Sequence, residues 1–253
     1  MFKINRKTLS YVSTKSPDDE IVDMLKRISE THPRWGFGLM SQRLKNLGYG
    51  WNHKRIYRVY CEMALNLRIK PKKRFPSRNP EHLCVPSMPN ETWSIDFMHD
   101  SLNNGRSFRT FNVIDDYNRE SLAIEVDFSL PSERVIRVLN RLILERGKPR
   151  KIRMDNGPEF ISSKLADWSE DHRVNLEHTK PGTPTQNAYV ERFNRTFRGE
   201  VLDFNIFESI EDAQWHATDW SWKYNNIRPH KSLGGKPPRG LCSAGAEGSM
   251  SLL

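Results

Sequence analysis

Hydrophobic residues near the start of the chain recur every three to four positions, a spacing typical of short amphipathic helices. The first predicted helix has Ser16 as its N-cap, Pro17 at its first position and three acidic residues in its first turn. A second helix is predicted over about 38–47, and a third begins at Asn52, a residue type that favours the N-cap. Together these helices predict a small all-α domain.

The third predicted helix is basic on the face opposite its hydrophobic residues. The cations of this face are Lys54, Arg55 and Arg58. Two short helices joined by a glycine-containing turn, the second of them basic, are typical of a helix-turn-helix that places one helix in the major groove of DNA. The alternative is a small helical bundle whose basic face is only solvated.

After a proline-rich stretch, the hydrophobic spacing changes to that of strands. Trp93, Ile95 and Phe97 occupy alternate positions, and similar runs follow at 108–114 and 122–128. Short turns join the three runs, which predicts an antiparallel meander. The rest of the chain alternates between helical and strand patterns, namely a helix at 131–146, a strand at 151–154, a helix at 163–172, a strand at 174–177, a helix at 185–201 and a helix from Ser209.

We therefore expect an α/β domain with a five-stranded mixed sheet flanked by helices, preceded by the all-α helix-turn-helix domain. The predicted boundaries are 1–69 for the helical domain and 70–90 for a basic, proline-rich linker. The sheet domain is predicted over 91–238, and the small residues of 239–253 indicate a disordered tail.

Positive charge is concentrated at one end of the chain. The 253 residues carry a formal net charge of +9, and residues 1–90 hold 18 Lys and Arg against 7 Asp and Glu. Such an excess favours a polyanion such as nucleic acid as partner, although a solvated basic surface gives the same pattern. No apolar run is long enough to span a bilayer or to act as a secretion signal, so we expect a cytoplasmic protein without a membrane partner.

Three carboxylates occupy positions suited to phosphoryl transfer. Asp96 interrupts a hydrophobic strand, Asp155 ends another strand, and Glu191 lies on a helix. Each has an alternative explanation when taken alone. Asp96 could be a surface residue of an edge strand, Asp155 could form a turn, and Glu191 could pair with Arg195 on the same helix. Together they favour two divalent ions roughly 4 Å apart, an arrangement used for displacement at phosphorus. The three cysteines are too far apart for a zinc site, which also indicates oxygen ligands.

The segments around these carboxylates resemble the DDE catalytic core of the retroviral integrase superfamily. They read WSIDF, MDNGPEF and TKPGTPTQNAYVERFNRTFR, with 35 residues between Asp155 and Glu191 and with Arg198 seven residues further on. The nearer resemblance is to the integrase-like subunit of two-reading-frame bacterial insertion-sequence transposases. It extends to VIDDYNRE, YNNIRPHKSL and GFGLMSQRLKNLGYGWNHKRIYRVY, and it covers about residues 18–238.

This resemblance implies a ribonuclease-H-like core that cuts the ends of a mobile element, joins the freed 3′-OH to another strand and excises the element as a circle. Asp96, Asp155 and Glu191 would bind two Mg²⁺ or Mn²⁺ ions. Arg198 and Lys180 would contact phosphate near the scissile bond. The other residues expected to bind DNA are Asn156 and Gln186 and, on the helix face of Glu191, Asn194 and Arg195.

The implied partners are double-stranded DNA at the element ends and the target, further copies of the chain on paired ends, and the protein of the upstream reading frame, possibly as a fusion. The implied location is the bacterial cytoplasm, at the nucleoid. The C-terminal segment GGKPPRGLCSAGAEGSMSLL departs from the family pattern. The alternative is a catalytically inactive remnant or a DNA-binding regulator.

Overall fold

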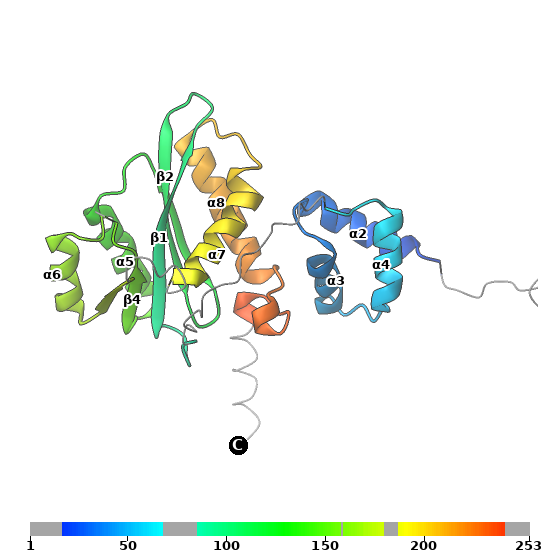
Figure 1. Ribbon diagram of the computed structural model, residues 1–253, viewed down its shortest axis with the longest axis horizontal. Coiled ribbons are helices and arrows are strands. Elements are labelled where there is room, and N and C mark those ends of the chain that lie inside the picture. The colour runs from blue at the N-terminus through cyan, green and yellow to red at the C-terminus, as the bar shows by residue number, and fades with distance from the viewer. Residues whose placement is uncertain (1–16, 68–84, 158, 180–186, 241–253) are drawn as a thin grey trace, which may run out of the picture. The chain divides into compact units, whose positions relative to one another are not determined.

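The computed structural model describes residues 17–67, 85–157, 159–179 and 187–240. The chain divides into two compact units, Met1–Ile69 and Lys70–Leu253 (Figure 1). Of the predicted linker, only residues 85–90 are described, and of the predicted tail only residues 239 and 240. Within the described ranges, none of the helices is long and apolar enough to cross a membrane.

Three helices build the N-terminal unit, as the hydrophobic spacing predicts. They are α2 (Asp19–Thr31), α3 (Phe37–Asn46) and α4 (His53–Glu62). Each buries hydrophobic side chains against the other two, and Leu25 and Leu44 are fully buried. The predicted cap of α4 is confirmed, because the Asn52 side chain accepts a hydrogen bond from the backbone N of Lys54 at 2.9 Å. The predicted N-cap of the first helix is wrong, because Asp18 occupies the N-cap position of α2 and Pro17 precedes the helix; Ser16 itself lies outside the described residues.

The larger unit is built on a five-stranded mixed sheet, as predicted. Its strands are β1 (Thr92–Ser101), β2 (Ser107–Asp115), β3 (Ser121–Asp127), β4 (Lys151–Met154) and β5 (Asn175–His178). The order is β3-β2-β1-β4-β5, with β1, β2 and β3 antiparallel and with β4 parallel to both β1 and β5. The central strand β1 therefore joins the meander to the parallel half of the sheet.

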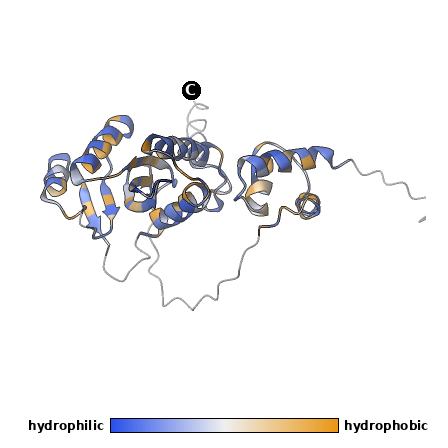
Figure 2. Cartoon of the chain, turned by 90° about the horizontal axis from the view of Figure 1, so that it is seen from above, coloured by the Kyte–Doolittle hydropathy of each residue, from blue (hydrophilic) through white to orange (hydrophobic). Residues whose placement is uncertain are grey.

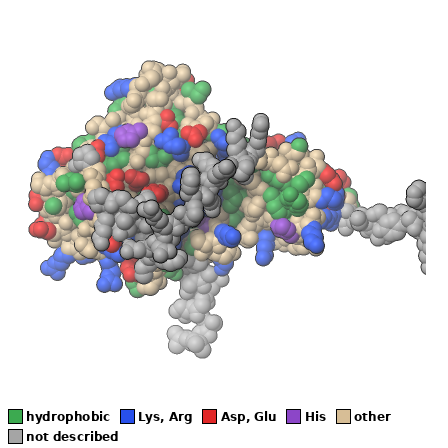
Figure 3. Space-filling model, in the orientation of Figure 1, with side chains coloured by type: hydrophobic (Ala, Val, Ile, Leu, Met, Phe, Trp, Pro, Cys, Tyr) green, Lys and Arg blue, Asp and Glu red, His purple; other side chains and the backbone are tan. Residues whose placement is uncertain are grey.

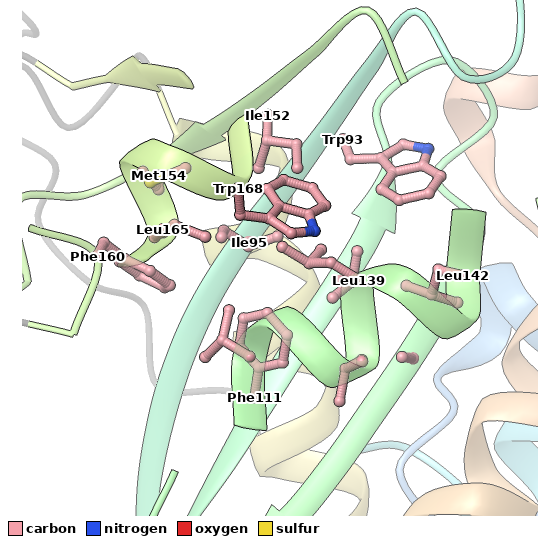
Figure 4. Close-up of a cluster of buried hydrophobic side chains, with 14 of the residues drawn as sticks. Trp93, Ile95, Phe111, Leu139, Leu142, Ile152, Met154, Phe160, Leu165 and Trp168 are labelled. Carbon is pink, nitrogen blue, oxygen red and sulfur yellow. The ribbon is translucent and has the colours of Figure 1, made fainter. Parts of the chain in front are cut away.

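One face of the sheet is covered by α5 (Ser132–Arg146) and α6 (Ser163–His172). Trp93 and Ile95 of β1 point into this layer, where they meet Leu139 of α5 and Trp168 of α6 (Figure 4). The alternation of hydrophobic and hydrophilic residues along the strands, visible in Figure 2, sends the intervening residues of β1 to the other face.

The other face is covered by α7 (Ala188–Phe197) and α8 (Ile210–Asn226) (Figure 1). Met98 of β1 packs there with Phe193 and Phe197 of α7. The helix predicted over 185–201 is described from Ala188, and its last turn widens into the π-helical segment η2 (Arg198–Leu202). The predicted start of α8 is confirmed, because the Ser209 side chain accepts a hydrogen bond from the backbone N of Asp212.

Candidate active site

Asp96 lies near the middle of the central strand β1, on the face that α7 covers. Burial raises the pKa of Asp96 to about 6, and the charges of Asp155 and Glu191 act in the same direction. Burial is the larger cause of this shift, and the added effect of the two charges indicates that Asp155 and Glu191 lie near Asp96. The three acidic side chains singled out from the sequence therefore converge on one region of the larger unit, and Figure 3 shows acidic side chains gathered on the visible face.

Two asparagine amides hold Asp96 in place. Nδ2 of Asn194 donates a hydrogen bond to Oδ2 of Asp96 at 2.7 Å, and Nδ2 of Asn112 donates to Oδ1 of Asn194 at 2.7 Å. Because an ionised carboxylate only accepts hydrogen bonds, the direction of both bonds is fixed. The other oxygen, Oδ1 of Asp96, accepts from the backbone N of Phe97 at 2.8 Å. Both oxygens of Asp96 thus have defined partners.

Asp155 reaches the same region because β4 runs parallel to β1 and ends beside it. It directly follows the last residue of β4, at the carboxyl edge where α/β sheets commonly present site residues. Its Oδ1 accepts a hydrogen bond from the backbone N of Gly157 at 3.0 Å. A Cβ atom at Gly157 would lie only 3.0 Å from that same oxygen, so glycine allows the loop to fold closely around the carboxylate.

Glu191 is positioned by the amphipathic character of α7. Val190, Phe193 and Phe197 of this helix are at most 2% exposed and pack against the sheet. Their burial fixes the rotation of the helix, and at about 100° per residue it leaves Glu191 on the exposed side, next to the edge that carries Asn194.

The three carboxylates fit a hard divalent cation in their chemistry. Mg²⁺ and Mn²⁺ prefer carboxylate oxygens, and a bound cation would remove the repulsion that contributes to the raised pKa of Asp96. Within the described ranges, no three side chains of His, Cys, Asp or Glu already lie close enough to form a complete metal site. The donor set is therefore suitable, and a cation would have to draw the carboxylates closer together.

The structure corrects the prediction for Asn194. We expected this residue among those that bind DNA, but it is only 7% exposed. Its position on α7 is at the edge that faces the sheet, and its amide contacts Asp96 and Asn112. The helical spacing puts Asn194 close to Glu191 around the axis of α7. Glu191 is nevertheless on the exposed side of the helix, and Asn194 is on the buried side.

The other candidate DNA-binding residues of the larger unit have different environments. Arg195 is exposed, whereas Arg198 donates a hydrogen bond to the carbonyl of His99 at 2.8 Å and lies 3.8 Å from a carboxylate oxygen of Asp100. Asn156 is exposed and donates to the carbonyl of Thr179 at 2.9 Å. Lys180 and Gln186 lie outside the described residues.

In the helical unit, Lys54 is exposed, but Arg55 and Arg58 both bind Asp18. The two ion pairs measure 2.7 Å and 2.5 Å, and Arg58 also binds Glu62 at 2.8 Å. Hydrogen bonds from Arg58 and Arg55 lower the pKa of Asp18. These arginines therefore tie α4 to the start of α2, a contact that the sequence did not reveal.

Asn112 is the residue of this site that the sequence interpretation missed. It lies directly opposite Asp96 in the pairing of β1 with β2 and is fully buried. The available signal is a polar side chain between Phe111 and Val113, in a strand that is otherwise hydrophobic there. Its partner becomes evident only when the strand register is known.

We expect Asn194→Ala to raise the Mg²⁺ concentration needed for half-maximal DNA cleavage by about 10–100-fold, because groups that orient metal ligands commonly have effects of this size. Asn112→Ala should shift the metal dependence in the same direction by a smaller factor, since it acts through Asn194. The measurement is cleavage of labelled DNA across a Mg²⁺ titration, with circular dichroism to confirm folding. An unchanged Mg²⁺ dependence in both variants would contradict a positioning role.

The fold and the carboxylates together define an integrase core. Two family models described as an integrase core domain match residues 86–184 and 172–238, and a model described as an HTH-like domain matches residues 16–74. The fold is similar to that of a chain in the cryo-EM structure of the simian T-cell lymphotropic virus intasome in complex with PP2A regulatory subunit B56 gamma. That match has a TM-score of 0.54 at 19% identity and covers 85% of this chain and 73% of the other.

Relatives of similar sequence come from bacterial insertion elements. The chain is 41% identical over 214 residues to the uncharacterized 39.2 kDa protein of IS476 from Xanthomonas euvesicatoria. The aligned part is 85% of this chain and 62% of that protein. It is 36% identical over 231 residues to the uncharacterized 31.7 kDa protein of IS407 from Burkholderia multivorans, and the aligned part is 91% of this chain and 83% of that protein. It is 25% identical over 256 residues to the putative transposase InsK of IS150 from Escherichia coli, and the aligned part is 93% of this chain and 89% of that protein.

The chain belongs to the family of insertion-sequence transposases with an integrase core domain. The matched part is less than two thirds of the IS476 protein, at 62% of its length. The predicted ribonuclease-H-like fold and the predicted helix-turn-helix region are both confirmed.

Proposed function

We propose that this chain cleaves the ends of a mobile DNA element and joins each freed 3′-OH to another DNA strand. The observation that supports this proposal is the placement of Asp96 on β1, of Asp155 directly after the adjoining strand β4, and of Glu191 on α7, the helix that covers the face of Asp96. A DNA-binding regulator has no need for three mutually repelling carboxylates on a sheet and an adjacent helix, so the enzyme is favoured over that alternative.

The three carboxylates would hold two Mg²⁺ or Mn²⁺ ions. Bound divalent ions activate the attacking hydroxyl and stabilise the leaving oxygen in this kind of displacement. Asn194 and Asn112 fix Asp96 on the strand, so that the ligand needs little reorganisation when DNA binds. Arg195, exposed on α7, would bind a phosphate near the carboxylates, and Arg198 would do so at the end of β1.

The proposed partners are the element ends and target DNA, a second copy of the chain on the paired end, and the protein of the upstream reading frame. Lys180, Gln186 and Asn156 would contribute further DNA contacts next to the carboxylates. The family resemblance implies that the element ends are paired and that more than one copy of the chain takes part. The proposed site of action is the bacterial nucleoid.

Metal removal tests the proposed chemistry. The full chain, alone and fused to its upstream-frame partner, should cleave labelled element-end DNA in Mg²⁺ or Mn²⁺ and should lose this activity in excess EDTA. Restored Mg²⁺ should restore cleavage, because the carboxylates bind the ion reversibly. Cleavage that persists in EDTA would contradict a metal-dependent site.

In the helical unit, we expect Lys54→Ala to weaken DNA binding several-fold and to reduce the slope of log affinity against log salt by about 0.9, the value for one lost phosphate contact. Arg55→Ala and Arg58→Ala should also loosen α4 from the start of α2, since both bind Asp18. The measurement is fluorescence anisotropy on duplex DNA at several salt concentrations. Lys26→Ala, on the exposed side of α2, is the matched control. If Lys54→Ala has the same slope of log affinity against log salt as the parent, Lys54 does not contact DNA.

A further inference from the structure

Three arginines and one buried histidine, which together form the basic cluster, come from three separate segments and lie around one place beside α7. Arg119 comes from the turn between β2 and β3, Arg192 from α7, and Arg228 and His230 from the segment that follows α8. Burial lowers the pKa of His230 to about 3, and the charges of Arg228, Arg119 and Arg192 all act on it in the same direction. The three arginines therefore share one neighbourhood.

Aromatic rings fix the geometry of this basic cluster. The guanidinium of Arg119 lies over the ring of Tyr189, with its Cζ 3.4 Å from the ring centre. Tyr224 of α8 contacts His230 edge to face at 4.8 Å and Phe193 of α7 at 5.1 Å between ring centres. The cluster is therefore attached to α7 and α8 through packed side chains.

Charge compensation in the basic cluster is incomplete. Arg228 forms an ion pair with Glu200. Within the described part of the chain, no carboxylate lies within ion-pair distance of Arg119 or Arg192, although the charge of Arg119 also acts on Asp116. Nη1 of Arg119 is shielded from solvent and has no hydrogen-bond acceptor among the described residues, while the side chain as a whole stays partly exposed. An oxyanion at the accessible part of Arg119 and at the exposed Arg192 would supply the missing negative charge.

The basic cluster and the carboxylates lie on opposite flanks of the exposed side of α7. At 100° per residue, Arg198 falls on the flank of Glu191, and Arg192 falls 100° away on the flank of Tyr189. Arg195 lies between the two flanks and is exposed. An extended polyanion can contact both flanks, and a DNA strand has a suitable row of phosphates.

We propose that Arg119 and Arg192, supported by Arg228 and His230, form a second binding site for the DNA backbone, so that one strand crosses α7 over Arg195 between the carboxylates and this site. The proposal rests on the proposed function, since it takes DNA as the ligand. A helix with its side chains is about 10–12 Å wide, a distance that a DNA strand spans with very few phosphates. The phosphate bound by Arg192 would therefore be only a few steps from the scissile phosphate.

The test measures DNA affinity against salt for the full chain on a random-sequence duplex. Arg192→Ala, an exposed position, should bind about tenfold more weakly and lose about 0.9 from the salt slope. Arg119→Ala should behave in the same way, and Arg192→Lys should keep most of the slope because it keeps the charge. The control is Arg137→Ala, which removes an exposed arginine from α5, the helix that packs on the other face of the sheet.

A second measurement locates the bound phosphate. Single methylphosphonate linkages are placed along element-end DNA, and a neutral linkage at one position a few steps from the cut should weaken binding by the parent but not by Arg192→Ala. If the parent binds and cleaves DNA while Arg192→Ala and Arg119→Ala keep its affinity and salt slope, this second site is contradicted and the proposed function stands. If the parent binds no DNA, both are contradicted.

Discussion

Glu191→Gln should reduce metal-dependent strand cleavage by about a thousandfold or more and leave DNA binding within a few-fold of the parent. The substitution keeps the size of the side chain and removes one negative charge from the proposed metal ligands. Loss of a ligand charge forfeits several kcal/mol of transition-state stabilisation, and each 1.36 kcal/mol corresponds to a factor of ten in rate. Single-turnover cleavage of labelled element-end DNA at saturating enzyme measures this effect.

Stability should not change in Glu191→Gln, because the side chain is exposed. The matched control is Glu170→Gln, which makes the same chemical change at an exposed position of α6 and should cleave at the parental rate. Equal activity of Glu191→Gln and the parent would exclude Glu191 from the site. Loss of DNA binding together with cleavage would assign it to DNA recognition instead.

Arg153→Met should destabilise the larger unit by about 3–5 kcal/mol, the usual effect of leaving one partner of a buried ion pair without the other. Arg153 of β4 binds Asp116 at 2.9 Å, and the two side chains are 7% and 0% exposed. Burial already raises the pKa of Asp116 to about 6, against the opposing charge of Arg153. Removing the arginine leaves a buried carboxylate with less compensation. Urea unfolding followed by tryptophan fluorescence measures the change.

Two further variants separate the charge from the packing. Lys164→Met breaks an exposed ion pair with Glu133 and should leave the unfolding midpoint unchanged, because exposed pairs contribute little. Adding Asp116→Asn to Arg153→Met should recover part of the lost stability, since the buried group is then neutral. If the double variant is less stable than Arg153→Met, the effect comes from packing and the buried charge is not its cause.

Local signals in the sequence were sufficient for most of the secondary structure. Asn52 marks the start of α4, Ser209 marks the start of α8, and the alternation from Trp93 predicts β1. These elements depend on capping and on hydrophobic period, which are properties of neighbouring residues. The antiparallel meander and the five-stranded mixed sheet also followed from these patterns, whereas the order β3-β2-β1-β4-β5 came from the structure.

Contacts between distant residues could not be read from the sequence. Asn112 and Asp96 are paired by strand register, and Arg58 meets Asp18 across forty positions of the chain. Asn194 was assigned to the wrong side of α7, because a helical wheel gives the angle between residues but not where the buried arc ends. The candidate carboxylates were found by their unusual positions, whereas the residues that orient them needed the tertiary structure.

Product analysis of one reaction tests the proposed chemistry most directly. Labelled element-end DNA is incubated in Mg²⁺ with the chain, alone and fused to its upstream-frame partner, and in parallel with Asp155→Asn. We predict a metal-dependent nick that leaves a 3′-OH at the element end, followed by joining of that end to another strand, and neither product with Asp155→Asn. DNA binding without cleavage by the fusion, or equal cleavage by Asp155→Asn, would contradict a carboxylate-based polynucleotidyl transferase.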